Sequence, residues 1–194
     1  MNKAERTRQF IIEKAAPVFN MKGYAGTSLS DMTEATGLTK GSIYGNFADK
    51  DEVALACFDY NYDIVRQEIR KEMDKHAGYR DKLLVYVDVY SNKSKYSLPV
   101  GGCPVLNTTV DADDTHPALR AKAGEALLNW KNTLTTLIEA GKASGEFKAT
   151  VNPEQMALTI IAMLEGMIVI SKGTGKPAYA RAVINSVETV IRGL

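Results

Sequence analysis

Three closely spaced helix starts constrain the fold of this chain more than any other feature of its sequence. They lie between Thr27 and Lys50, in the stretch TSLSDMTEATGLTKGSIYGNFADK. Ser28 can cap a first short helix, and Asp31 three residues later completes a capping box, so the unpaired amide donors at that helix start find side-chain acceptors. Gly37 then ends the first short helix.

A second short helix and the start of a third follow at once. Thr39 can cap a helix over Lys40–Phe47, and Asp49 with Glu52 forms another cap-and-return pair that opens a third helix. Two short helices joined by a tight turn and followed directly by a third are typical of a helix-turn-helix. The alternative is a helical hairpin whose glycines are plain turn residues.

The second short helix has one apolar face and one nearly bare face. Ile43 and Phe47 point to one side, and Gly41, Ser42 and Gly45 lie on the other. Two glycines in so short a helix cost roughly 1 kcal/mol each relative to alanine, which close approach to another backbone would explain. The bare face therefore predicts a helix that enters the major groove of DNA.

Side chains beside the bare face indicate how a duplex would be held. Ser42 can reach base edges, Lys40, Tyr44 and Lys50 can hold phosphates, and Asn46 can contact either. Small side chains offer few bidentate base contacts, so we expect DNA shape and phosphate contacts to carry much of the affinity.

The composition excludes a general attraction to polyanions. The net charge is +1, and residues 1–50 hold seven Lys or Arg against five Asp or Glu, so binding must come from placed side chains. The two cysteines, Cys57 and Cys103, form no paired framework and suit a reducing cytoplasm. The start MNKAERTRQF lacks the apolar stretch of a signal peptide, and the apolar run Met156–Ile170 falls short of the roughly 20 residues of a membrane span. We expect a cytoplasmic protein with no membrane segment.

Helical spacing of apolar residues continues through the rest of the chain. It predicts a first helix over Lys3–Lys22, ended by Gly23, and one long helix from Asp49 to about Lys75. Strand signals are absent, so the expected fold class is all-α. Further helices are predicted at Arg80–Lys95, Pro104–Val110, Pro117–Ser144, Pro153–Lys172 and Pro177–Arg192.

The segment GYAGTSLSDMTEATGLTKGSIYGNFADKDEV resembles the DNA-binding region of the tetracycline-repressor (TetR/AcrR) family. The resemblance covers about the first 55 residues and departs from many relatives at Gly45 and Asn46. It implies phosphate contacts from Thr27, Ser28 and Tyr44. It also implies base contacts from Ser30, Lys40, Gly41 and Ser42.

The resemblance further implies a homodimeric repressor with two domains. Residues 1–50 would form a three-helix helix-turn-helix domain that binds double-stranded operator DNA, and residues 51–194 a helical domain for ligand binding and dimerisation. A twofold lets two recognition helices address successive faces of the major groove. A small-molecule inducer would move the long helix after Asp49 and change the separation of the two helix-turn-helix domains of the dimer.

Aromatic, methionine and polar side chains in the carboxy-terminal helices are the candidates for a ligand site, because they offer adaptable apolar walls with a few polar tips. For any single one of them, filling the core is the alternative. The candidates are Phe58, Tyr62, Tyr86, Tyr90, Cys103, Asn107, Trp130, Met163 and Met167.

Cys103 stands out in the segment LPVGGCPVLNTTVDADDTHP. Pro104 suits a first helical position, so Cys103 would lie at a helix start, where the helix dipole favours thiolate. The segment is similar to one in the NemR-like, electrophile-responsive branch of the family, and Lys172 lies where a second reactive group could approach. The alternative is a small buried thiol.

Other functional classes find little support in the sequence. There is no nucleophile elbow, no pair of carboxylates at a defined spacing, and only two histidines, so an enzyme is the less favoured alternative, as is a helical module that binds only protein. Neither a metal nor another cofactor is indicated. The group Asp111, Asp113, Asp114 and His116 resembles a metal site but is more typical of helix caps and solvated charge.

Overall fold

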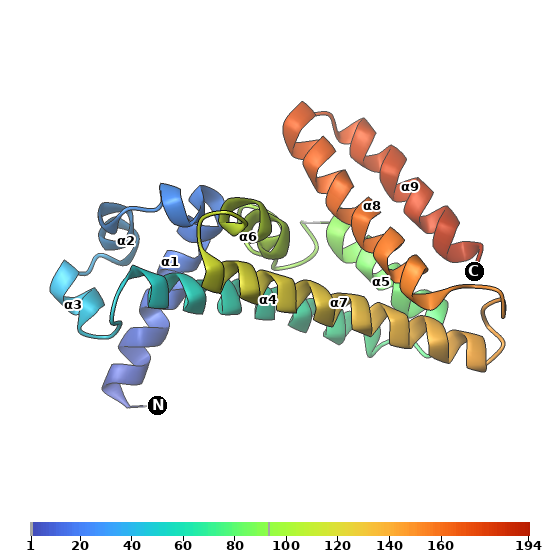
Figure 1. The fold of residues 1–194 in the computed structure, drawn as a ribbon, viewed down its shortest axis with the longest axis horizontal. Helices are drawn as coiled ribbons and strands as arrows, with labels where there is room; N and C mark the ends of the chain where they lie inside the picture. The colour runs from blue at the N-terminus through green and yellow to red at the C-terminus, as the bar shows by residue number, and fades with distance from the viewer. Residues whose placement is uncertain (1, 93) are drawn as a thin grey trace. The chain divides into compact units, whose positions relative to one another are not determined.

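The computed structural model describes residues 2–92 and 94–194, and these residues form helices and connecting turns without any strand. The predicted all-α fold is confirmed. The helices are α1 (Lys3–Gly26), α2 (Leu29–Thr36), α3 (Lys40–Tyr44), α4 (Lys50–Met73), α5 (Tyr79–Ser91), α6 (Pro104–Ala112), α7 (Pro117–Ala143), α8 (Pro153–Thr174) and α9 (Pro177–Arg192) (Figure 1).

Two predicted helix ends are wrong, each for a local reason. The second short helix stops at Tyr44, before Phe47, because the Asn46 side chain donates a hydrogen bond to the Ser42 carbonyl at 2.8 Å. The helix predicted to reach Lys95 stops at Ser91. There the chain folds back, and the Lys95 ammonium pairs with Asp88 of α5 at 2.5 Å.

By its internal packing the chain divides into two compact units. Unit 1 comprises the chain up to Val65 together with Pro99–Ala126, and unit 2 comprises Arg66–Leu98 and Leu127–Leu194. Helices α4 and α7 each pass from one unit into the other along the chain. The boundary predicted near residue 50 separates a DNA-binding domain from a ligand-binding domain, whereas the two units are defined by packing alone. That boundary therefore stays a prediction.

Unit 1 is built around α1. Its residues Ile11, Ala15 and Ala16 are fully buried, and α1 packs against both α2 and α6. The buried Asn61 of α4 donates to the Ala16 carbonyl at 2.9 Å, which fixes α4 against α1. The regular part of α1 ends at Gly23, as predicted, where the backbone turns to φ +71° before a last turn to Gly26.

Unit 2 is built around the pair α8 and α9, and α5 packs against α9 (Figure 1). Glu146, in the α7–α8 connection, caps α5 by accepting the backbone N–H groups of Tyr79 and Arg80, each at 2.8 Å. The fully buried core side chains include Leu134, Ile138, Ile160, Leu164, Val187 and Ile191.

Helix α8 contains the apolar run Met156–Ile170. It has 22 residues and a mean hydropathy of 1.6 in its most apolar window, of which 33% is buried. Within the two described ranges, α8 alone is long and apolar enough to cross a membrane, by length and composition only, and the expectation of no membrane segment stays a prediction. The core helix of a soluble protein can pass the same test.

Candidate nucleic-acid interface and ligand residues

The start of α2 is fixed by the predicted capping box. The Ser28 hydroxyl accepts the Asp31 backbone N–H at 3.1 Å, and the Asp31 carboxylate accepts the Ser28 backbone N–H at 2.7 Å. Lys22 of α1 donates to the same carboxylate at 2.5 Å. The bonds from Lys22 and then Ser28 hold the pKa of Asp31 well below its usual range, so this cap stays charged in neutral solution.

Helix α3 presents part of the bare face that the sequence predicts, namely Gly41 and Ser42. Gly45 lies outside the helix as its C-cap residue, where an added Cβ would lie 3.0 Å from the Gly41 carbonyl oxygen. Thr39 accepts the Ser42 backbone N–H at 3.2 Å, and Ile43 is fully buried with Phe47 almost so. Gly41 is exposed, and a Cβ there would meet only the Thr39 hydroxyl, at 3.9 Å. Packing within the chain therefore does not require glycine at position 41.

The residues predicted to contact DNA are not equally available. Ser28, Ser30, Lys40 and Ser42 are exposed together with Gly41. Thr27 is fully buried and its hydroxyl donates to the Gly23 carbonyl at 2.6 Å, so its side chain has no surface to offer a phosphate. Asn46 is half-buried and is already bonded to the Ser42 carbonyl. A DNA contact from either side chain would first require its bond to break.

Lys50 and Tyr44 lie at the exit from α3. The Lys50 ammonium lies 4.3 Å above the Tyr24 ring, a cation–π contact that holds it at the first residue of α4. The Tyr24 hydroxyl in turn donates to Asp51, and this bond, with burial and nearby carboxylates, raises the pKa of Tyr24 to about 12. Tyr44 is half-buried at the end of α3.

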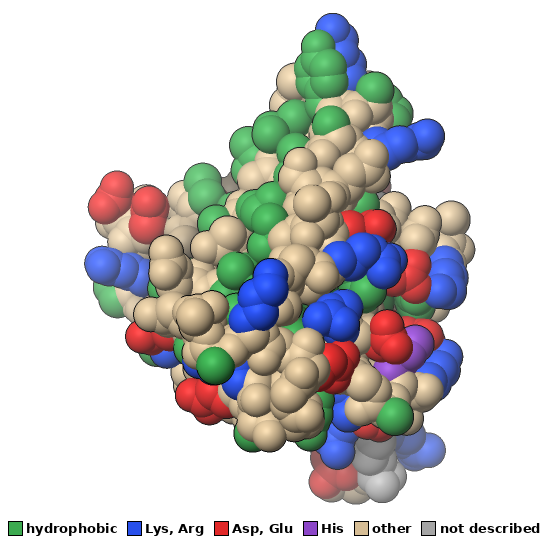
Figure 2. Space-filling model, turned by 90° about the vertical axis from the view of Figure 1, so that its right-hand side faces the viewer, with side chains coloured by type: hydrophobic (Ala, Val, Ile, Leu, Met, Phe, Trp, Pro, Cys, Tyr) green, Lys and Arg blue, Asp and Glu red, His purple; other side chains and the backbone are tan. Residues whose placement is uncertain are grey.

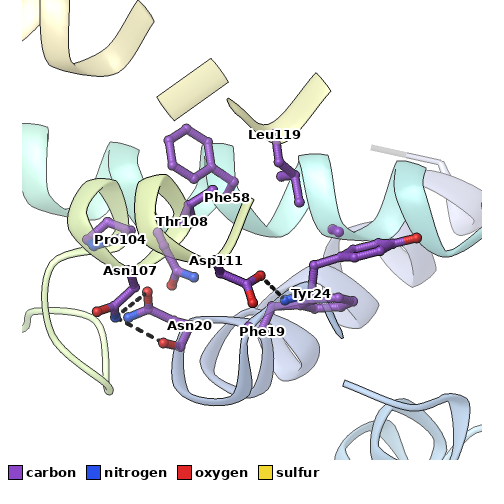
Figure 3. A pocket seen from close by; sticks show the side chains of 12 residues that line it. Phe19, Asn20, Tyr24, Phe58, Pro104, Asn107, Thr108, Asp111 and Leu119 are labelled. Carbon is purple, nitrogen blue, oxygen red and sulfur yellow. Dashed lines mark hydrogen bonds between the residues drawn. The ribbon is translucent and has the colours of Figure 1, made fainter. Parts of the chain in front are cut away.

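Four of the predicted ligand residues belong to unit 1. Phe58 and Tyr62 stack with ring centroids 6.0 Å apart, and Phe58 and Asn107 line a hollow between α1, α4 and α6 (Figure 3). The hollow measures about 360 Å³ with its mouth, but the centre of a water molecule can reach only about 20 Å³ of it. It therefore has room for about one water and is too small for a drug-sized ligand.

The other five belong to unit 2, where three aromatic rings stack. Trp130 lies 6.0 Å from Tyr86 and 5.4 Å from Tyr90, centroid to centroid, and both pairs are within 14° of parallel. Trp130 is 6% exposed, and its indole N–H has no hydrogen-bond partner among the described residues. On α8, Met167 is buried and Met163 half-buried.

Cys103 occupies the predicted place at the start of α6. It is the N-cap residue, Pro104 follows at the first turn, and the cysteine is 5% exposed. Its side chain makes no capping hydrogen bond. Lys172 belongs to unit 2. Its approach to Cys103 and the sensing role stay predictions.

The acidic residues around His116 serve local structure. Asp111 accepts the Tyr24 backbone N–H at 2.6 Å, and Nδ1 of His116 accepts the Leu119 backbone N–H at 3.2 Å at the start of α7. Within the described part of the chain, no three His, Cys, Asp or Glu side chains converge as metal ligands would.

The comparisons with known proteins cover the whole chain. Residues 11–57 match the family described as "Bacterial regulatory proteins, tetR family", and residues 80–187 match "Tetracyclin repressor-like, C-terminal domain". The chain belongs to the tetracycline-repressor (TetR/AcrR) family. A crystal structure of a TetR-family transcriptional regulator from Cytophaga hutchinsonii is 51% identical with a TM-score of 0.95, covering 100% of this chain and 97% of that one.

Two further similar proteins are more distant. The transcriptional regulator TtgR of Pseudomonas putida is 25% identical over 85% of this chain and 80% of its own. The reduced form of E. coli NemR has a TM-score of 0.81 over 95% of this chain and 97% of its own, but at 19% identity this likeness shows the fold alone.

Family membership decides the class of function. This TetR-family chain is a ligand-responsive, DNA-binding transcriptional repressor and not an enzyme. Regulators of this family are soluble proteins that bind operator DNA, usually as homodimers, and respond to small molecules. Sequence reasoning missed the contact of Arg8 with Asn46 and that of Asp111 with Tyr24, because these partners lie far apart along the chain.

Proposed function

We propose that each protomer of a homodimer inserts α3 into the major groove of a double-stranded operator in the cytoplasm. The observation that supports this most directly is Gly41. It is exposed in a helix, its missing side chain has room within the protein, and its cost to the helix is explained by a duplex that lies against it.

The exposed residues around Gly41 then divide into two kinds of contact. Lys40 and Ser42 lie on the bare face and meet base edges, as does the exposed Ser30 of α2. Ser28, Tyr44 and Lys50 hold phosphates at the two ends of the motif. Thr27 is left out because it is fully buried, and Asn46 because it is half-buried and its amide nitrogen is bonded to the Ser42 carbonyl. Ser28 and Ser42 are exposed, although each hydroxyl also has a bond within the protein.

The dimer contact that we propose uses α8 and α9. The outward side chains Leu158, Val169, Ile170 and Tyr179 are exposed by 49%, 55%, 38% and 46%, respectively. Figure 2 shows hydrophobic side chains gathered toward the end of unit 2 where α8 meets α9. A second copy of the chain that covers this surface removes these apolar side chains from water, which stabilises the dimer.

The inducer that we propose has a flat apolar part and a hydrogen-bond acceptor. Tyr86, Tyr90 and Trp130 form a buried stack of flat rings, and the Trp130 N–H is a buried donor with no acceptor among the described residues, which costs about 1–3 kcal/mol. Trp130 is the single tryptophan in the chain, so its fluorescence would report on an inducer bound there.

The experiment that tests DNA reading compares Gly41→Ala with Gly124→Ala. Gly124 is an exposed helical glycine of α7 with nothing within 4 Å of an added Cβ, which makes it a matched control. Both variants should fold at least as stably as the parent, because alanine favours helices. The probe is a duplex that the parent protein selects from a random DNA library.

Gly41→Ala should weaken binding to that duplex about tenfold or more, whereas Gly124→Ala should leave it unchanged. If Gly41→Ala binds the selected duplex as tightly as the parent, α3 does not approach DNA as proposed. A parent protein that selects no duplex at low salt would refute the proposed function altogether.

A further inference from the structure

The guanidinium of Arg8 in α1 contacts residues that follow α3 along the chain. One terminal nitrogen donates to the Asn46 carbonyl at 2.6 Å, and the other donates to the Glu52 carboxylate at 2.7 Å. The guanidinium carbon lies 3.9 Å from the centroid of the Phe47 ring. A single side chain thus contacts the end of α3, the apolar anchor behind it and the start of α4.

Glu52 completes the arrangement from the other side. Its second carboxylate oxygen accepts the Ala48 backbone N–H at 2.7 Å, and its own backbone N–H donates to Asp49 at 2.8 Å. The predicted cap-and-return pair is therefore only half correct, since the Glu52 side chain returns to Ala48 and not to Asp49. The Ala48 bond and then Arg8 lower the pKa of Glu52, so it stays ionised near neutral pH.

The orientation of α3 depends on these contacts because the helix is very short. It spans Lys40–Tyr44, far below the length at which a helix is stable by itself. Its end is closed by the Asn46 side chain on the Ser42 carbonyl, and the Asn46 carbonyl is what Arg8 holds. A shift of Asn46 would therefore turn the bare face of α3.

We propose that Arg8 is a positioning residue for operator recognition, which sets the angle of α3 through Asn46 and Glu52 without contacting DNA itself. This inference rests on the proposed reading of DNA by α3. An exposed ion pair contributes little to stability, about 0–1 kcal/mol. The contacts of Arg8 with Asn46, Phe47 and Glu52 instead determine the orientation of α3. Their loss should therefore affect discrimination between DNA sequences more than it affects folding.

Lysine cannot replace arginine in this role. The guanidinium is a rigid planar fork that donates in two directions while it stacks on an aromatic ring, whereas an ammonium is a compact point charge. Arg8→Lys should therefore lose discrimination nearly as Arg8→Ala does, although it keeps the positive charge. Arg6, exposed on the same helix, provides the matched control Arg6→Ala.

The test measures binding to two duplexes of equal length, one selected by the parent from a random library and one with its bases scrambled. Arg8→Ala and Arg8→Lys should each bind the selected duplex about tenfold more weakly and the scrambled duplex unchanged. The slope of log affinity against log salt should stay that of the parent, and Arg6→Ala should keep the parent's preference. Circular dichroism and thermal unfolding would confirm that each variant is folded.

Three results would overturn the inference or its basis. If Arg8→Ala keeps the parent's preference for the selected duplex, Arg8 does not position α3. If both affinities fall equally and the salt slope drops by about one, Arg8 is a phosphate contact. A parent that does not discriminate between the duplexes would refute the reading of DNA by α3, which is a separate failure. Should Arg8→Ala not fold, Arg8→Lys and Glu52→Gln provide the same comparison.

Discussion

The carboxylate of Asp111 in α6 accepts the backbone N–H of Tyr24 at 2.6 Å, at the point where α1 kinks (Figure 3). The kink arises at Gly23, whose φ of +71° breaks the regular helix and frees that N–H from its usual acceptor. Asn107 of the same helix donates to the Asn20 backbone carbonyl at 3.0 Å. Helix α6 thus binds the polar backbone groups that the kink leaves open.

Gly23→Ala should be strongly destabilising. A Cβ at this position would lie 2.5 Å from an Asp111 carboxylate oxygen, and the positive φ disfavours any side chain. We expect the free energy of unfolding to fall by about 2–3 kcal/mol, measured by urea denaturation. Gly124→Ala, at an open helical position, should instead raise it by about 0.5–1 kcal/mol.

The double variant Gly23→Ala/Asp111→Ala separates the two causes of this loss. Removing the carboxylate relieves the collision but leaves the unfavourable φ, so part of the loss in Gly23→Ala should be recovered relative to Asp111→Ala alone. Equal losses from Gly23→Ala in both backgrounds would show that Asp111 does not crowd position 23.

Tyr24 should titrate about two pH units above an ordinary tyrosine. Its pKa is raised to about 12 from the usual 10.0, chiefly by the hydrogen bond to Asp51. Because the folded state holds this proton more tightly, Tyr24 contributes stability fully below pH 10, and the contribution is lost as the pH rises through about 12. Alkaline absorbance titration of the parent, minus that of Tyr24→Phe, measures the pKa.

The variant Asp51→Asn tests the cause of the raised pKa. Without the carboxylate charge at position 51, the Tyr24 pKa should move back toward its ordinary value. A Tyr24 that ionises near pH 10 in the parent would contradict the contact itself.

Local signals in the sequence were sufficient for α2 and the start of α3. Ser28, Asp31 and Thr39 act on amides within three residues of themselves, so their spacing alone predicts the caps. The bond from Arg8 to Glu52 spans 44 residues, and the bond from Asp111 to Tyr24 spans 87. Nothing in one sequence pairs such distant residues, which is why these contacts were missed.

The ligand residues show a second limit of sequence reasoning. Phe58 and Trp130 both lie at helical spacing with other apolar residues, and this pattern is the same for a packed core as for a binding site. Only the structure separates them. Phe58 lines a hollow in unit 1, whereas Trp130 stacks in unit 2 with an indole donor that finds no acceptor in the part of the chain that the structure describes.

Both thiols should be unreactive in the native protein. Burial raises the pKa of Cys57, and Cys103 is only 5% exposed, so neither offers an accessible thiolate. A thiol reagent such as DTNB should modify neither cysteine within minutes under native conditions and both in urea. Operator release by an electrophile should be the same for the parent and for Cys103→Ser. Rapid native modification that Cys103→Ser abolishes would favour the sensor hypothesis instead.

Val169→Asp should separate the proposed dimer into monomers. Val169 is 55% exposed on α8, and a carboxylate there would have to leave water when a second copy covers the helix. Sedimentation at micromolar concentration should show a dimer for the parent and a monomer for the variant. Two linked DNA-binding domains bind a duplex far more tightly than one does. Binding of the variant to a selected duplex should therefore weaken by about a hundredfold or more.

The control for this variant is Val110→Asp, which places the same charge on an exposed valine of α6, outside α8 and α9. It should sediment as the parent does and bind the duplex unchanged. If Val169→Asp remains a dimer, the copies meet through another surface, and the exposed apolar side chains of α8 need a different explanation. Membrane association is one such explanation, given the length and hydropathy of α8, and flotation of the parent with lipid vesicles would detect it.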